Sequence, residues 1–359
     1  MRRVKKIAVL RANGLGDFIF TVPALTALRE TFPDAQIVYL GKDWHRQFLL
    51  KRKTLVDNII VIPPMKGISM DNVYTDDQRQ IEAFYKKMQE ENFDVAIQLH
   101  GGGQYSNTFI ENLGASYTIG TKTDNAQPLN EAIPYEYYQN EILRWLEVVS
   151  LIGASTKHIS PQLTATKDDV NEAKKILGNN KKFIVIHPGA TDLKRRWPCK
   201  RFARVGDYFA QKGFRIIITG SGDEREIVKN TIHAMTLPAD NFYGKLSINA
   251  LTGLLSVAAL VVANDTGPLH LANALGTTTV GIYWCANLIN AAPPFRNNSV
   301  CLSSWIIHCP ICQTDCASGY PFDTPTSSCK HEISFVTKTT VTEVITAAEK
   351  MLLRKAVKG

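Results

Sequence analysis

The triplet Asp265-Thr266-Gly267 has the residue types of the loop that carries a catalytic carboxylate in aspartic proteases. A pepsin-like site needs two such loops on all-β lobes, so that two carboxylates share a proton. The sequence holds one Asp-Thr-Gly triplet, and it lies between an apolar segment and a segment of helical period. We therefore interpret the loop as a ligand site at the start of a helix, where Thr266, Gly267 and free backbone N–H groups are available to an anion.

A second loop with chemical potential contains Gly14, Gly16 and Asp17, directly after the first apolar segment. Glycines let the backbone approach a ligand, and the following helix offers its N–H groups to an anion. Asp17 is placed either to cap that helix or to take a proton from a sugar hydroxyl. A dinucleotide pattern would need glycine where the chain has Ile19, and no Walker-type phosphate loop occurs, which argues against NAD and ordinary ATPase sites.

A third loop places Lys194, Arg195 and Arg196 in a row, three residues after Thr191. Arginine can donate two parallel hydrogen bonds to phosphate oxygens, so the cluster suits a diphosphate. The alternative is a solvated surface turn.

Acidic residues in the same half of the chain suit the sugar parts of a ligand. Glu224 follows an apolar segment and is placed either for ribose hydroxyls or as favourable charge at a helix start. A carboxylate beside phosphate would repel it, so we expect Asp265 to bind sugar hydroxyls, with capping as the alternative. His270, one turn into the helix, either packs or contacts substrate, and Lys245 is a candidate nucleotide contact.

Four cysteines cluster near the end of the chain in a C-x2-C-x3-C-x12-C pattern, at Cys309, Cys312, Cys316 and Cys329. In a reducing compartment such a cluster favours a structural Zn or Fe site over disulfides, and free thiols are the other expectation. A site closed by four sulfurs leaves no open position for catalysis.

Apolar and helical segments alternate along the chain, which predicts parallel sheets covered on both faces. The segment that begins at Lys181 repeats the design of the segment that begins at Lys5, so we expect a second domain of the same kind. The fold class is α/β, with two Rossmann-like doubly wound domains that face a cleft and bind ligand at the carboxyl ends of their strands. We expect domains at 1–165 and 166–335, a linker within 154–169 and a terminal helix in 336–359.

The charge balance of 41 Lys and Arg against 33 Asp and Glu gives +8, which favours acidic partners. The basic residues are spread along the chain and accompany no nucleic-acid motif, so we expect no nucleic-acid partner. Arg11 interrupts the first apolar run, which excludes a signal peptide, and the segment 254–263 is too short to span a bilayer. We expect a cytoplasmic protein, and peripheral contact with the inner face of the inner membrane stays open.

Taken in order, these motifs resemble the heptosyltransferase family, glycosyltransferase family 9. The resemblance rests on "RANGLGDFIFTVPALTALRETFP", "HPGATDLKRRWP" and "YGKLSINALTGLLSVAALVVANDTGPLHLANALGTTTVGIYW", followed by the cysteine-bearing segment. It implies the two-domain GT-B fold, with acceptor bound mainly by the first domain and nucleotide sugar by the second. It also implies inverting transfer of heptose from ADP-heptose to an anionic, lipid-linked acceptor of the lipopolysaccharide inner core, with no cofactor for catalysis.

The resemblance also implies residue roles. Asp17 matches the family's catalytic base, and Arg195 stands where the family has a basic residue, often Lys, on the donor diphosphate. Glu224 matches the acid that binds ribose, and Asp265 the acid that contacts the donor sugar. The alternatives are a relative that uses another nucleotide sugar or a protein or small-molecule acceptor, and a nucleotide-sugar-binding protein without transfer activity.

Overall fold

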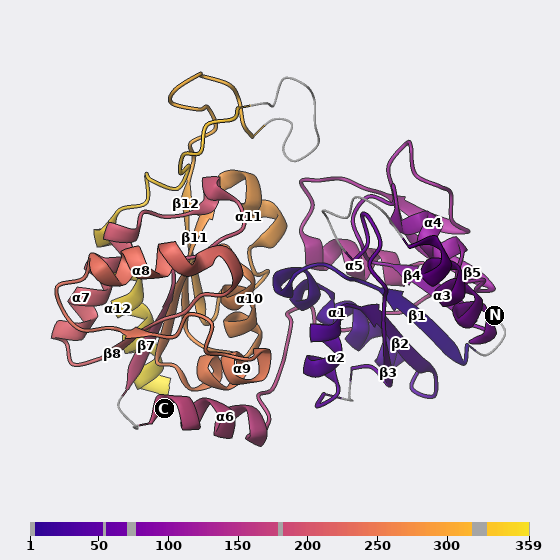
Figure 1. Ribbon diagram of the computed structural model, residues 1–359, viewed down its shortest axis with the longest axis horizontal. Coiled ribbons are helices and arrows are strands. Elements are labelled where there is room, and N and C mark those ends of the chain that lie inside the picture. Colours follow the sequence, from indigo (N-terminus) through magenta and orange to yellow (C-terminus); the bar gives the residue numbers. More distant parts are fainter. Residues whose placement is uncertain (1–3, 53–54, 70–76, 179–181, 318–328, 359) are drawn as a thin grey trace. The chain divides into compact units, whose positions relative to one another are not determined.

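The computed structural model describes residues 4–52, 55–69, 77–178, 182–317 and 329–358. The chain divides into two compact units, Met1–Pro161 and Gln162–Gly359. Each unit is a parallel β-sheet with helices on both faces (Figure 1).

The sheet of the first unit has six strands in the order β3-β2-β1-β4-β5-β6, and all of its described pairings are parallel. The chain first builds outward from β1 to β3, then returns to the other side of β1 with β4, so the strand order reverses between β1 and β4. The strands are Lys6–Leu10 (β1), Gln36–Gly41 (β2), Asn58–Val61 (β3), Val95–Gln98 (β4), Tyr117–Lys122 (β5) and Glu131–Pro134 (β6).

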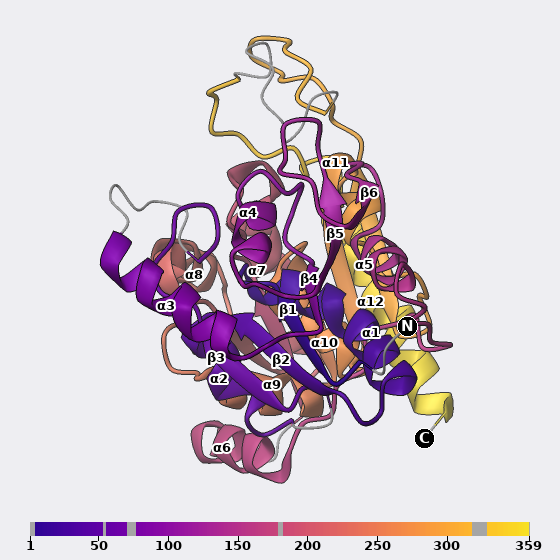
Figure 2. The same cartoon turned by 90° about the vertical axis from the view of Figure 1, so that its right-hand side faces the viewer.

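Helices cover both faces of this sheet. Helices α3 and α4 pack on the face that carries Ala8 and Leu10, where Met88 and Phe109 complete a buried cluster. Helices α1 and α5 pack against each other on the opposite side (Figure 2). The helices are Leu15–Thr31 (α1), Asp43–Leu49 (α2), Gln78–Glu90 (α3), Ser106–Glu111 (α4) and Glu141–Ser150 (α5).

The second unit repeats this topology, with parallel strands in the order β12-β11-β10-β7-β8-β9. Its strand order reverses between β7 and β10, the counterparts of β1 and β4. The strands are Phe183–His187 (β7), Arg215–Ile218 (β8), Asp240–Asn241 (β9), Leu260–Asn264 (β10), Thr279–Trp284 (β11) and Ser299–Ser304 (β12).

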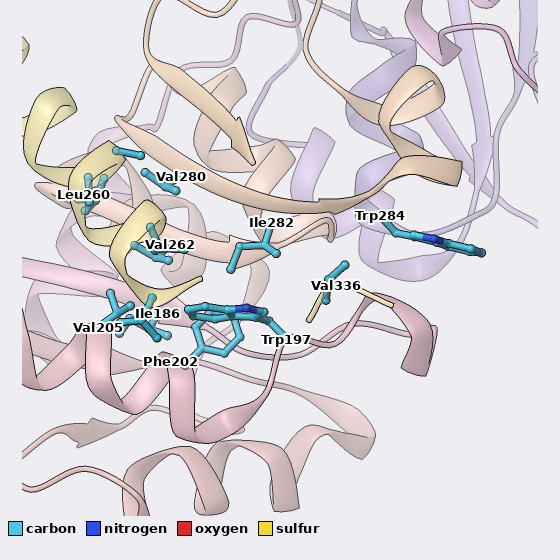
Figure 3. Packing of buried hydrophobic residues seen from close by; sticks show 14 of the residues in the cluster. Ile186, Trp197, Phe202, Val205, Leu260, Val262, Val280, Ile282, Trp284 and Val336 are labelled. Atoms are coloured by element: carbon cyan, nitrogen blue, oxygen red, sulfur yellow. The ribbon is translucent and has the colours of Figure 1, made fainter. Parts of the chain in front are cut away.

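The core of the second unit lies between the sheet and helices α7, α8 and α12. Ile186, Val262 and Ile282 from three neighbouring strands meet Trp197 and Phe202 there (Figure 3). Helices α9 and α10 contact each other, and α10 packs against β10 and β11. The helices are Lys167–Leu177 (α6), Leu193–Arg195 (η1, 3-10), Cys199–Gln211 (α7), Gly222–Glu224 (η2, 3-10), Arg225–His233 (α8), Ile248–Val257 (α9), Gly267–Ala274 (α10), Cys285–Ala291 (α11) and Val341–Lys358 (α12).

The expected fold class of two doubly wound parallel sheets is confirmed. The sequence analysis did not predict strand β6, helix α5 or edge strand β12. Helix α6 begins at Lys167, inside the expected linker, because Thr166 caps it by accepting a hydrogen bond from Asp169 N at 3.1 Å. No helix in the described ranges is long and apolar enough to cross a membrane.

Candidate active site

Each of the four central strands is followed or ended by a buried polar side chain. These side chains are Arg11 after β1, Gln98 at the end of β4, His187 at the end of β7 and Asn264 at the end of β10, and each is 3% exposed or less. Ligands of doubly wound sheets bind at the carboxyl ends of the strands where the strand order reverses. Candidate site residues are therefore sought in each unit by itself, in the loops after its two central strands.

In the first unit, Asp17 is held at both carboxylate oxygens. Oδ2 accepts a hydrogen bond from Gly14 N at 3.0 Å, which closes the first turn of α1, and Oδ1 accepts one from Arg11 Nη2 at 2.8 Å. Gly14 is the N-cap residue and Gly16 lies in the first turn, so Asp17 is the third helical residue rather than the cap itself. The Asp17 side chain remains 42% exposed, so it is fixed in orientation and still reachable from solvent.

Arg11 holds Asp17 from a buried position. Its guanidinium also donates to Leu99 O at 2.6 Å and to Glu141 Oε2 at 3.2 Å, and it lies 4.8 Å from the centre of the Trp145 ring. Burial alone would lower the pKa of Arg11, but the charges of Asp17 and Glu141 outweigh burial and raise it. Arg11 is therefore a fixed positive charge beside the Asp17 carboxylate.

A second buried arginine completes this charge network. Glu141, the first residue of α5, pairs through Oε1 with Nη1 of Arg144, which is fully buried. The network of Arg11, Asp17, Glu141 and Arg144 thus contains two positive and two negative charges, which is how buried charges are tolerated.

The loop after β4 adds a histidine beside the same strand end. His100 Nδ1 accepts a hydrogen bond from Ala12 N at 3.2 Å, and the side chain is almost wholly buried. Burial lowers the pKa of His100 to about 3, and the nearby positive charge of Arg11 acts in the same direction. His100 is therefore neutral at physiological pH.

In the second unit, residues 191–197, here called the basic loop, are bonded to the Asp-Thr-Gly loop. Arg195 Nη1 lies 3.3 Å from Asp265 Oδ2, and Arg196 Nε donates to Ala190 O at 2.7 Å. Trp197 N donates to the side chain of Asn264 at 3.0 Å, so the strand end of β10 fixes the far end of the loop. The arginines that sequence reasoning selected are thus held in one defined conformation.

Asp265 itself is 1% exposed and is engaged by two side chains. Besides Arg195, His270 Nε2 lies 2.9 Å from Asp265 Oδ1. Burial would raise the pKa of Asp265, but the hydrogen bond from His270 and the charge of Arg195 lower it. Asp265 is therefore a charged partner of Arg195 and His270, and its contact with sugar hydroxyls stays a prediction.

Glu224 lies on η2, where its Oε2 accepts from Ser221 N at 2.8 Å and its Oε1 lies 3.4 Å from His187 Nε2. Burial would raise the pKa of Glu224, but His187 lowers it, so the carboxylate stays ionised. Gly189 makes this arrangement possible, because a Cβ at that position would lie 1.9 Å from Glu224 Oε1.

The remaining residues predicted for the second unit are less closely joined. Thr266 is the N-cap of α10 and Gly267 its first residue, so both lie where a helix N-terminus can meet an anion. Thr191 and Lys245 are exposed, and the Lys245 ammonium lies 5.9 Å from the Phe242 ring. In the described part of the chain, no hydrogen bond or ion pair joins either of them to Arg195.

The cysteine cluster differs from the expected set of four thiols. Cys309, Cys312 and Cys329 gather with His331, and their ligand atoms all lie within 4.8 Å of one another. Cys316 lies outside this group, and its Sγ is 3.4 Å from Thr314 O. A hydrogen bond from Thr314 lowers the pKa of Cys312 to about 6, which favours the thiolate that metals bind.

Sequence reasoning missed the partners of the predicted residues, chiefly Arg11, Glu141 and His187. For Arg11 and His187 a usable signal existed, because a polar residue that closes an apolar central strand must find a buried partner. Glu141 gave no such signal, since it begins an exposed-looking amphipathic helix far along the chain.

The sequence matches the family described as "Glycosyltransferase family 9 (heptosyltransferase)" over residues 81–319. Among curated relatives, lipopolysaccharide core heptosyltransferase OpsX of Haemophilus influenzae is 22% identical over 298 residues, covering 80% of this chain and 82% of the relative. Lipopolysaccharide heptosyltransferase 1 of Campylobacter coli is 24% identical over 315 residues, covering 81% and 86%.

Solved structures share the fold. A family 9 glycosyl transferase from Veillonella parvula has a TM-score of 0.79 at 20% identity and covers 98% of both chains. Escherichia coli heptosyltransferase WaaC with ADP-2-deoxy-2-fluoro heptose has a TM-score of 0.63 at 19% identity, covering 84% of this chain and 93% of that one. The iron-containing dodecameric glycosyltransferase TibC from enterotoxigenic E. coli has a TM-score of 0.55 at 10% identity, covering 99% and 78%.

Proposed function

Since the chain belongs to glycosyltransferase family 9, the heptosyltransferase family, and is therefore a sugar-transferring enzyme, we propose that it moves heptose from ADP-heptose to an acceptor sugar of the lipopolysaccharide inner core. The names of the relatives support this substrate pair, because OpsX is a lipopolysaccharide core heptosyltransferase and WaaC was solved with an ADP-heptose analogue. The acceptor is an anionic, lipid-linked oligosaccharide, which suits a chain of charge +8 at the cytoplasmic face of the inner membrane.

The observation that best supports the proposal is the set of fixed charges after β7, β8 and β10. Arg195, held by buried Asp265, and Arg196 bind the donor diphosphate together with the N-terminus of α10 at Thr266. Glu224 accepts hydrogen bonds from the ribose hydroxyls. Asp265 orients Arg195 and His270, and its direct contact with the donor sugar stays a prediction.

Asp17 is the general base of the proposed reaction. It takes the proton of the acceptor hydroxyl as that oxygen attacks the anomeric carbon, through a transition state with oxocarbenium character, and ADP departs from the opposite face with inversion. Arg11 holds the Asp17 carboxylate in one orientation through a hydrogen bond to Oδ1. The charge that grows on ADP is stabilised by Arg195 and Arg196, so catalysis needs no metal ion.

Two measurements on the full chain test the proposal. Calorimetric titration with ADP, GDP and UDP should show selective binding of ADP, and Asp17→Asn should bind ADP as the wild type does while losing at least 100-fold in transfer rate, in line with the loss of a general base. Preference for another nucleotide would overturn ADP-heptose as donor and leave the family intact. Normal turnover by Asp17→Asn would contradict the role of Asp17 as general base. Activity on a protein or small molecule alone would contradict the proposed lipopolysaccharide acceptor.

The Cys/His group fits a structural metal ion. For bond lengths of about 2.3 Å to sulfur and 2.05 Å to nitrogen in a tetrahedron, sulfur and nitrogen ligands lie about 3.5 Å apart. Cys309 Sγ and Cys329 Sγ lie 3.6 and 3.5 Å from His331 Nδ1. The donor set therefore suits Zn or Fe, and the iron of TibC supports the second choice. A site closed by four protein ligands supplies rigidity and takes no part in the transfer step.

A further inference from the structure

We propose that a metal ion held by Cys309, Cys312, Cys329 and His331 orders the basic loop that binds the donor diphosphate. This inference rests on the proposed function, since it gives the metal a role in donor binding. The connection is the segment 333–339, here called the return segment, which leads from the Cys/His group to α12. It contacts the basic loop at both ends.

One end of the return segment is bonded to the residue before Arg195. Phe335 N donates to Lys194 O at 2.8 Å, and Phe335 O accepts from Ser304 Oγ at 2.6 Å. Phe335 and Val336 are fully buried, and the Phe335 ring lies 5.2 Å from that of Trp284. His331, a member of the metal group, is four positions before Phe335 in the chain.

The other end of the return segment is bonded to the residue after Arg196. Trp197 Nε1 donates to Thr339 O at 2.9 Å, and Val336 lies in the same buried cluster as Trp197 and Trp284 (Figure 3). The hydrogen bonds at Lys194 and Trp197 thus bracket the two arginines. A shift of the return segment would move the backbone that carries both guanidinium groups.

A metal ion in the Cys/His group would fix the position of the chain just before the return segment. Cys309 and Cys312 lie on the leg of chain that leaves β12, where Cys309 N donates to Thr314 O at 2.9 Å and Cys316 N to Ile307 O at 2.8 Å. Cys329 and His331 lie on the leg that leads back. A metal ion joins the two legs, which removes conformational freedom from the return segment before the donor binds. A preordered site loses less entropy on binding and so binds more tightly.

Two cysteine variants separate this role from general stabilisation. Cys312→Ser removes the exposed member of the metal group, where loss of packing is smallest, and Cys316→Ser changes a buried neighbour outside the group. For each full-length protein we would measure Zn and Fe per chain by atomic emission, the ADP dissociation constant by calorimetry, and hydrogen exchange of peptides that cover 191–197 and helix α8.

The proposal predicts one metal ion per wild-type chain, little in Cys312→Ser and an unchanged content in Cys316→Ser. Cys312→Ser should bind ADP roughly tenfold more weakly and exchange faster at 191–197 with α8 unaffected. Cys312→His, which restores a ligand, should recover both properties.

The proposal is overturned if the wild type holds no metal, or if Cys312→Ser loses the metal with unchanged ADP affinity and unchanged exchange at 191–197. Equal acceleration at α8 would also overturn it, because the metal would then stabilise the whole unit. Should the wild type hold metal without binding ADP, the proposed donor fails, and exchange at 191–197 still decides whether the metal orders the loop.

Discussion

Replacing Glu141 by Gln tests the buried charge network of the first unit. Glu141 is 13% exposed and contacts two guanidinium groups, those of Arg11 and Arg144. At about 4 Å and an effective dielectric constant of about 20, each attraction amounts to roughly 4 kcal/mol before desolvation is subtracted. Because Gln keeps the shape and loses the charge, we expect a net loss of about 3 kcal/mol in the free energy of unfolding, the lower end for breaking a buried pair.

The assay is calorimetric unfolding of the full chain, where a loss of this size should lower the melting temperature of the first unit by roughly 6 to 12 °C. The control is Glu147→Gln on the same helix, because Glu147 is exposed and its carboxylate accepts a hydrogen bond from Gln139 Nε2 at 2.7 Å. That control should change stability by no more than about 0.5 kcal/mol. Equal and small effects of the two variants would refute the reasoning, since the buried charges would then be screened like surface charges.

Three further predictions concern the strand ends. Asp265→Asn should destabilise the second unit by about 3 kcal/mol in denaturant titrations, because Arg195 loses its buried partner, and ADP binding should weaken with it. Gly189→Ala should weaken ADP binding about tenfold with little change in melting temperature, since the new Cβ displaces only the end of the Glu224 side chain. Burial lowers the pKa of His100 to about 3. The neutral imidazole therefore contributes fully to the free energy of unfolding above pH 6.5, and this contribution is lost as pH falls toward 3. At pH 5 the loss is about 2 kcal/mol, and His100→Gln should remove this part of the pH dependence measured by urea unfolding.

The central strands were predictable because they are apolar on both faces and short. β1, β7 and β10 each lie within an expected segment, and the helices between them show helical period. Edge strand β12 escaped because its sequence, Ser299–Ser304, mixes polar and apolar residues in a partly exposed position. Helix α5 was missed although Asn140 caps it and its buried apolar residues recur at helical spacing; only its packing against α1 has no local signal.

The candidate site was predictable as a set of loops and unpredictable as a set of contacts. Asp17 and Arg195 were selected from residue type and from their place after a strand. Their partners are distant in sequence, since Glu141 is 130 positions from Arg11 and Asp265 is 70 positions from Arg195. Periodicity reports only neighbours along one element, so it cannot identify such pairs. The same limit explains why spacing alone suggested Cys316 where the structure brings in His331.

Two of the buried polar residues at the ends of the central strands, Gln98 and Asn264, separate the framework of this enzyme from the exposed positions of its loops. Asn264 bonds Pro188 O at 2.8 Å as well as Trp197 N, and Gln98 donates to Gly101 O at 3.1 Å and accepts from His100 N at 3.0 Å, so each holds the backbone of a loop. Backbone anchors hold a loop in shape whatever side chains it carries. An engineer who wishes to change the sugar or the acceptor therefore has a simple rule, which is to vary the exposed loop positions between the anchors and to leave the anchors alone.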